Sequence, residues 1–140
     1  QTAQALEDGW YRTGDIGYLD DEGYLYLVDR AKDMIISGGE NVYCSEVEEV
    51  IYQHPKVLEA TVFGIPHEQW GEQVHAVVVP RDDSLTDTDL IDFCRTSLGG
   101  YKVPRSVEFQ SKELPKSGPG KVLKRELRAP FWEGKDRSIN

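Results

Sequence analysis

The alternation of apolar and polar residues predicts a β-hairpin near the start of the chain. Apolar and aromatic runs at residues 18–19 and 24–28 flank an acidic segment, residues 20–23, that ends in glycine. An acidic turn of this kind between two such runs is a hairpin signal. Because an isolated hairpin is marginally stable in water, we expect it to pack against a part of a larger domain outside this chain.

Four further stretches have the length and composition of strands. They lie at residues 34–36, 57–65, 73–79 and 107–109. Pro66 and Pro80 are expected to close the second and third strands, because proline cannot donate a hydrogen bond to a sheet. The polar segments 37–41 and 66–71 are expected to be loops.

Three segments predict helices. The first begins at Ser45 as its N-cap and is stopped at Pro55; the second spans residues 86–98, with acidic residues near its N-terminus. The third spans residues 122–128 and is stopped by Pro130. The mixed order of strands and helices predicts an α+β domain, a small sheet flanked by helices.

Composition narrows the classes of function. The 140 residues suffice for one domain, and the net charge of −9 argues against a nucleic-acid partner. No apolar stretch approaches the roughly 18 residues of a membrane span. The three histidines follow no metal-binding spacing, so no metal site is expected; Cys44 and Cys94 are expected to be free thiols in a reducing compartment.

Three glycine-containing polar loops are the candidate ligand-binding segments. They lie at residues 11–15, 37–41 and 117–121, the last inside a cluster of lysines and arginines. Glycine lets backbone N–H groups approach a ligand closely, and a neighbouring lysine suits a phosphate. None matches the GxxxxGK[ST] or GxGxxG fingerprint. Taken singly, each loop could be an ordinary turn.

Four motifs stand in register along the chain: GWYRTGD at residues 9–15, DRAKDMIISGGENV at 29–42, SEVE at 45–48, and a lysine-rich segment at 114–125. In this order they resemble the adenylate-forming acyl-CoA synthetases of the AMP-binding ligase superfamily. The likeness runs from about residue 9 to residue 128. It departs at Cys44, where many members carry proline.

The resemblance implies an enzyme that activates a carboxylic acid with ATP to an acyl-adenylate and pyrophosphate, and then transfers the acyl group to CoA. It implies that residues 1–29 end a large N-terminal domain, that residues 30–128 form a C-terminal lid, and that residues 129–140 are a polar tail. The family's phosphate loop and acyl pocket lie in the large domain, the expected partner. This chain alone is therefore expected to be inactive and to bind no Mg²⁺, although Mg²⁺ is implied with ATP; the expected location is cytoplasmic, with any membrane association left to the missing domain.

The resemblance also assigns roles to single residues. Lys121 is the catalytic lysine, a mobile cation that stabilises charge on the acyl carboxylate and α-phosphate as pyrophosphate leaves. Asp15 and Arg30 contact the ribose of ATP, and Lys32 is the hinge. A further group contacts CoA, beside the pantetheine tunnel or at a phosphate. Its members are Ser37, Gly38, Gly39, Glu40, Trp70 and Lys102.

Overall similarity favours a fatty or related lipophilic acid as the substrate. Two alternatives stay open: the lid of a peptide-synthetase adenylation domain, and a free-standing nucleotide-binding α+β module without catalysis. Gly39 together with the segment 66–71 favours CoA over a carrier protein. The apolar hairpin before Arg30 argues against a free-standing module, since it resembles the edge of a larger domain.

Overall fold

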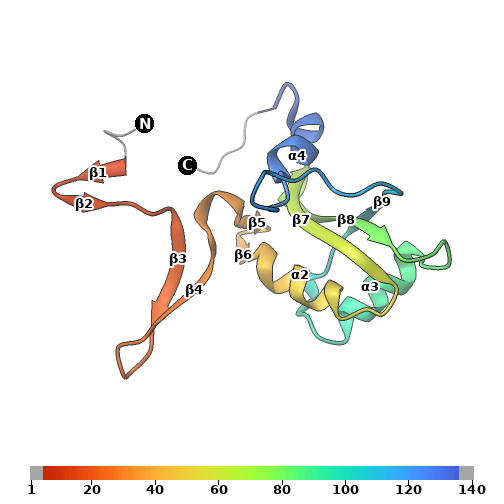
Figure 1. Cartoon of the computed structure of the whole chain (residues 1–140), viewed down its shortest axis with the longest axis horizontal. Helices are drawn as coiled ribbons and strands as arrows, with labels where there is room; N and C mark the ends of the chain where they lie inside the picture. Colours follow the sequence, from red (N-terminus) through yellow and green to blue (C-terminus); the bar gives the residue numbers. More distant parts are fainter. Residues whose placement is uncertain (1–4, 136–140) are drawn as a thin grey trace.

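The computed structural model describes residues 5–135, and its elements fall into an extended hairpin and a compact body (Figure 1). The hairpin consists of β3 (Asp15–Leu19) and β4 (Leu25–Arg30), preceded by the two-residue strands β1 (Leu6–Glu7) and β2 (Trp10–Tyr11). The body is a five-stranded sheet with helices on both faces. The predicted α+β class is confirmed.

Turn chemistry makes the hairpin where the sequence predicts it. A carboxylate oxygen of Asp20 accepts hydrogen bonds from the backbone N–H groups of Glu22 and Tyr24, both at 2.9 Å. Gly23 completes the turn at φ +85°, a conformation that favours glycine. The strands pair antiparallel, and their large apolar side chains are exposed.

The sheet is organised around β8. The order is β6-β5-β8-β7, with β9 also beside β8 and parallel to it. Bounds are β5 Ile35–Ser37, β6 Glu40–Val42, β7 Val57–His67, β8 Gly71–Pro80 and β9 Ser106–Phe109. The long antiparallel pairing of β7 with β8 ends where His67 lies opposite Gly71. β5 joins β8 at that same end, where Ser37 pairs with Gly71.

Two strand boundaries were placed wrongly from the sequence. Pro66 lies inside β7, opposite Glu72, and does not close the strand. Among the described strands β7 pairs with β8 alone, so it is an edge strand, where proline is tolerated. Segment 37–41 is not a long loop. Strand β5 continues to Ser37 and strand β6 begins at Glu40, so only Gly38 and Gly39 form the turn between them.

The helices are α2 (Cys44–Tyr52), α3 (Asp87–Arg95) and α4 (Lys124–Trp132), with short 3₁₀ turns η1 (Ala31–Asp33) and η2 (Gly100–Lys102). None of the described helices has the length and apolarity needed to cross a membrane.

Thr86 begins α3 as predicted. Its hydroxyl accepts from the Asp89 N–H, and the Asp89 carboxylate accepts from the Thr86 N–H, forming a reciprocal capping box. The helix ends at Arg95, three residues earlier than expected. The N-cap position of α2 is Tyr43 and not Ser45, because the Ser45 hydroxyl is used in a tertiary hydrogen bond.

Helix α4 continues past Pro130, contrary to the sequence prediction. A proline removes one helical hydrogen bond, and tertiary contacts can offset that cost. Here the Trp132 indole N–H donates to the Gly64 carbonyl at 2.9 Å, and Phe131 packs against the sheet. The polar tail predicted from residue 129 therefore begins too early, and its last part, residues 136–140, lies outside the described residues.

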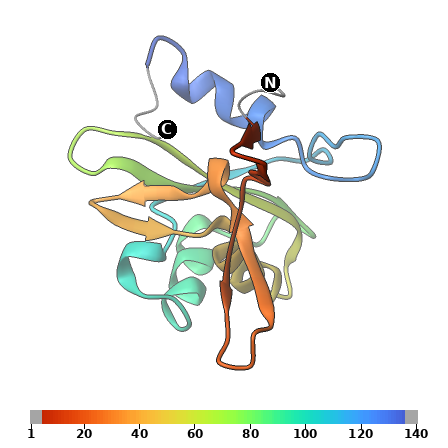
Figure 2. The same ribbon diagram turned by 90° about the vertical axis from the view of Figure 1, so that its left-hand side faces the viewer.

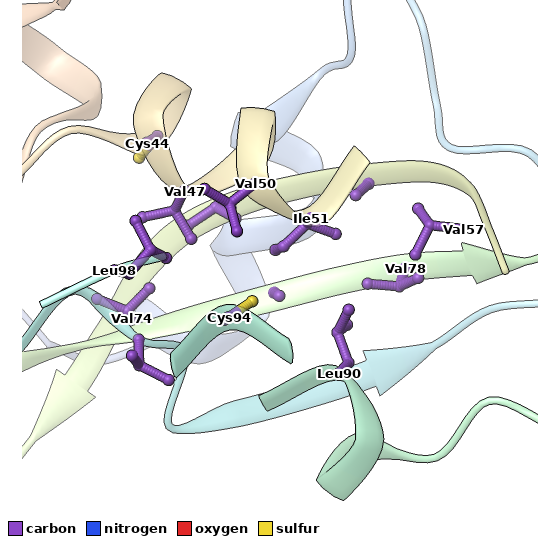
Figure 3. Close-up of a cluster of buried hydrophobic side chains, with 14 of the residues drawn as sticks. Cys44, Val47, Val50, Ile51, Val57, Val74, Val78, Leu90, Cys94 and Leu98 are labelled. Atoms are coloured by element: carbon purple, nitrogen blue, oxygen red, sulfur yellow. The ribbon is translucent and has the colours of Figure 1, made fainter. Parts of the chain in front are cut away.

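Two apolar clusters hold the sheet between its helices. The larger lies under α2 and α3, where Val47, Val50 and Ile51 share one cluster with Leu90 and Leu98 against the sheet (Figure 3). The smaller lies on the opposite face under α4. It consists of Phe63, Val77, Val79 and Leu114, with partly buried Ile65, Val122, Leu127 and Phe131 against it. Burial on both faces explains why β7 and β8 read as near-continuous apolar runs.

Candidate functional site

Asp15 and Arg30 face each other at the base of the hairpin. They occupy paired positions on β3 and β4, and the Arg30 Nη1 lies 3.1 Å from the Asp15 Oδ1. The Gly14 carbonyl accepts the Ala31 N–H at 2.7 Å, which joins the GWYRTGD loop to the start of the hinge. Half of the Arg30 side chain and a quarter of the Asp15 side chain stay exposed. The carboxylate is thus held in place yet open to a diol.

The hinge and the lysine-rich segment share one hollow. A space of about 760 Å³ is lined by Arg30, Lys32 and Lys121, together with Lys124 and Arg125 from α4. Arg30, predicted to contact the ribose, Lys32, predicted as the hinge, and Lys121, predicted as the catalytic lysine, therefore border the same space. Its basic lining contrasts with the acidic chain as a whole and suits an anionic ligand.

The segment that carries Lys121 has a defined backbone. We call residues 115–123 the lysine loop. The Ser117 N–H donates to the Lys121 carbonyl, and the Leu123 N–H donates to the Pro115 carbonyl, each at 2.8 Å. Gly120 adopts φ +89° at the tip. The Lys121 side chain itself is exposed, so a fixed backbone presents a mobile cation.

The β5–β6 hairpin meets Trp70 at the other end of the sheet. The Gly38 N–H donates to the Trp70 carbonyl at 2.9 Å. A Cβ on Gly38 would lie 3.1 Å from the indole ring, whereas a Cβ on Gly39 would meet nothing within 4 Å. Of the predicted CoA group, Gly38 to Glu40 and Trp70 thus lie together on one surface, with Ser37 directly before them in the chain. Ser37 is buried in the sheet and Glu40 is exposed.

Arg105 is a candidate that sequence reasoning missed. Its guanidinium lies 4.0 Å from the centroid of the Trp70 ring, a cation–π stack that leaves a second cation beside the glycine turn. No motif marks it, because the two residues are brought together only by the pairing of β8 with the segment before β9. Lys102, predicted to meet a CoA phosphate, instead forms an ion pair with Glu46 of α2 at 2.9 Å.

The two groups of residues lie at opposite ends of the β7–β8 pair. The lysine loop is joined to β7 at Glu59, near the start of that strand, and Trp70 and the glycine turn adjoin its far end at His67. At about 3.3 Å per residue, the stretch from Glu59 to His67 spans roughly 26 Å. In Figure 2 the β5–β6 hairpin, in orange, and the loop before α4, in blue, point to opposite sides of the body.

The thiols are poor nucleophiles in this fold. Burial raises the pKa of Cys44 to about 12 and that of Cys94 to about 11, so both stay protonated near neutral pH. The Cys44 thiol donates to the Asp33 carbonyl at 2.9 Å, a packing role beside the hinge. Within residues 5–135 no three His, Cys, Asp or Glu side chains are grouped as a metal site.

Comparisons with known proteins agree with this geometry. Residues 46–121 match the family model described as the AMP-binding enzyme C-terminal domain. A feruloyl-CoA synthase of an Amycolatopsis species is 53% identical over 93% of this chain and 26% of its own length. A long-chain-fatty-acid–CoA ligase of Yersinia pestis is 54% identical over 91% of this chain and 22% of its own length. The chain thus spans about a quarter of the length of these curated relatives.

Solved structures show the same likeness. A Mycobacterium tuberculosis fatty acyl CoA synthetase superposes with a TM-score of 0.75 at 47% identity, covering 96% of this chain and 27% of that one. ATP-bound MatB from Rhodopseudomonas palustris gives a TM-score of 0.84 at 36% identity, covering 93% and 26%. The resemblance read from four motifs is confirmed, and the chain belongs to the family of AMP-binding enzyme C-terminal domains.

Proposed function

We propose that this chain is the lid of an ATP-dependent acyl-CoA ligase, which converts a carboxylic acid, ATP and CoA to acyl-CoA, AMP and pyrophosphate through an acyl-adenylate. One observation carries the proposal: the lysine loop contacts β7 at Glu59 and the glycine turn adjoins its other end at His67, a stretch of strand that spans roughly 26 Å. Both half-reactions act on the same carboxyl group: in the first its oxygen attacks the α-phosphate of ATP and pyrophosphate leaves, and in the second the CoA thiol attacks its carbon and AMP leaves. A lid that serves both must therefore rotate between them.

Adenylation is assigned to the hollow beside the hinge. Asp15 can accept both hydroxyls of the ATP ribose, and Arg30 holds that carboxylate in place while adding a donor of its own. Lys121, on the same hollow, supplies a cation for the charge that develops on the α-phosphate and acyl carboxylate. Lys32, in η1 between the hairpin and the body, is the pivot.

Thioester formation is assigned to the opposite end. The turn at Gly38 and Gly39 offers a thin backbone edge along which the pantetheine arm can pass, with Trp70 beside it. Arg105, stacked on Trp70, is a better candidate for a CoA phosphate than Lys102, whose ammonium already pairs with Glu46.

The large N-terminal domain is the proposed partner, in a cytoplasmic enzyme. The β3–β4 hairpin carries several exposed large apolar side chains, and such contiguous apolar residues mark an interaction surface. That domain would bring the adenine site, the Mg²⁺ that accompanies ATP, and the acyl pocket. The relatives named for long-chain fatty and feruloyl substrates support a lipophilic acid.

The test separates the two half-reactions in the full-length enzyme that carries this chain. Lys121→Ala should lower acid-dependent pyrophosphate release about 10²- to 10³-fold, as expected for a lost transition-state charge. Acyl-CoA formation from supplied acyl-adenylate should remain near the wild-type rate. The matched control is Lys112→Ala, an exposed lysine outside the hollow. Equal loss in both half-reactions would show that Lys121 is structural; a pantetheinyl carrier protein accepted in place of CoA would favour a peptide-synthetase lid.

A further inference from the structure

The lysine loop fixes its own shape but not its place on the body. Its internal hydrogen bonds join Ser117 to Lys121 and Pro115 to Leu123, all within the loop. Something outside must therefore orient the loop relative to the sheet. Two carboxylates from the body reach it, one on each flank.

Glu59 of β7 holds the first flank. One of its carboxylate oxygens accepts the Leu114 backbone N–H at 3.3 Å, and the other forms an ion pair with the Lys116 ammonium. The Glu59 side chain is 18% exposed and that of Lys116 is 31% exposed. The pair is thus half-shielded from water, unlike the fully exposed pairs that contribute little.

Glu48 of α2 holds the second flank. Its Oε1 lies 2.7 Å from the Lys124 ammonium, in the first turn of α4. The same oxygen accepts the Val62 backbone N–H at 2.9 Å and the Thr61 hydroxyl at 3.2 Å. The carboxylate is therefore fixed to β7 before it holds the lysine.

The charge on Lys124 persists in this setting. Burial by itself would lower the pKa of Lys124, but the neighbouring Cys44, Glu48 and Asp33 together outweigh burial, and the pKa lies above its ordinary value. The ammonium thus stays available to the ion pair across the physiological range.

Apolar contacts keep the fold intact independently of these ion pairs. Leu114 is buried in the cluster under α4, and Val122 packs against the same cluster. Loss of an ion pair should therefore shift the loop without unfolding the lid. Placement matters for a cation that acts on developing charge, since an error of about 1 Å can cost about 10²-fold in rate.

We propose that Glu59 and Glu48 are positioning residues for the adenylation step, a two-sided clamp that sets Lys121 through Lys116 and Lys124. The clamp deepens the proposed function and rests on the role given there to Lys121. It acts on the lysine loop alone, so the glycine turn at the opposite end should be insensitive to it.

The test uses Glu59→Gln and Glu48→Gln in the full-length enzyme. Glutamine keeps the size of each side chain and an oxygen that can accept from Leu114 or Val62, but it removes the charge. Each variant should lower the maximal rate of pyrophosphate release about tenfold, with the KM for ATP and the rate of acyl-CoA formation from supplied acyl-adenylate near wild type. Lys112→Met is the matched control.

A second pair of variants tests the clamp from the lysine side. Because Glu48 and Glu59 are unchanged in these variants, the result does not depend on whether the glutamate variants fold correctly. Lys124→Met should behave like Glu48→Gln, whereas Lys124→Arg, which keeps the charge, should recover most of the rate. Two outcomes would overturn the clamp while Lys121→Ala remains selective. One is a wild-type adenylation rate in Glu48→Gln and Lys124→Met, and the other is an equal loss of both half-reactions in these two variants. If Lys121→Ala is itself unselective, the proposed function fails and the clamp fails with it.

Discussion

Gly39 offers the sharpest separation of backbone strain from function. Its φ is +85°, and an added Cβ would meet no atom within 4 Å. Gly23, in the turn of the β3–β4 hairpin, has the same φ of +85° and the same open surroundings. Alanine at either position therefore meets the same backbone penalty and no clash within the chain. Only Gly39 lies on the surface proposed to border the pantetheine arm.

The strain sets the expected change in stability. A non-glycine residue in the left-handed region costs roughly 1–2 kcal/mol. Gly39→Ala and Gly23→Ala should each lower the free energy of unfolding by about that amount, measured by urea denaturation of the full-length enzyme, in which the β3–β4 hairpin has its partner domain. The agreement of the two values checks that they are matched.

The functional effect should differ between them. A methyl group forced into an occupied passage costs about 1–3 kcal/mol, which is about 5- to 150-fold in rate at 1.4 kcal/mol per factor of ten. In the full-length enzyme, Gly39→Ala should slow acyl-CoA formation from acyl-adenylate by this factor, and Gly39→Leu by more. Pyrophosphate release should stay near wild type in both.

Two results would refute the assignment. The first is a wild-type thioester rate in Gly39→Leu, which would show that nothing passes the turn. The second is an equal loss in Gly23→Ala, which would attribute the effect to backbone strain. Because no atom of residues 5–135 lies within 4 Å of a Cβ at Gly39, a selective loss must come from a ligand or a docked domain.

Two further predictions concern the stability of the body. Thr86→Ala should lower the free energy of unfolding by about 1 kcal/mol, because it removes the reciprocal cap with Asp89. Thr88→Ala, on the exposed surface of the same helix, is the control and should change that free energy little. Equal urea midpoints for the two variants would refute the prediction. Burial lowers the pKa of His75 below its ordinary value of 6.5, partly offset by Glu108, so its contribution to stability is complete above about pH 6.5 and is lost as the pH falls. His75→Gln should therefore flatten the decline of the unfolding free energy between about pH 7 and about pH 5, and an unchanged slope would contradict it.

Element boundaries could be predicted from the sequence where they depend only on interactions between residues close together in the chain. The Asp20 turn and the start of α3 at Thr86 are formed by residues a few positions apart, and the sequence predicted the position of both. The end of α4 was not, because Pro130 is outweighed by a hydrogen bond from Trp132 to Gly64, far away in the chain. Sequence propensity gives way wherever a tertiary contact decides the boundary.

The site divides in the same way. The residues around Lys121 and Gly39 stand in contiguous motifs, so their neighbourhoods were predictable by resemblance. The stack of Arg105 on Trp70 was not, nor was the carboxylate of Glu48 beneath the lysine loop, because each joins separate elements through the folded sheet. A sequence motif identifies the residues that contact the ligand, but it does not identify the residues elsewhere in the chain that hold them in position.

Ser45 shows how one such error bears on the proposed rotation. The sequence assigned it to cap α2, but its hydroxyl donates to the Val28 carbonyl at 2.7 Å, and its backbone N–H donates to the Asp29 carboxylate at 3.2 Å. Both bonds join α2 to β4, on the two sides of the proposed hinge. Since each is worth about 0.5–1.5 kcal/mol net, breaking them costs about 1–3 kcal/mol, a bias that substrate binding can offset. In the proposed rotation, the residue misread as a local cap would thus favour one pose of the lid without locking it there.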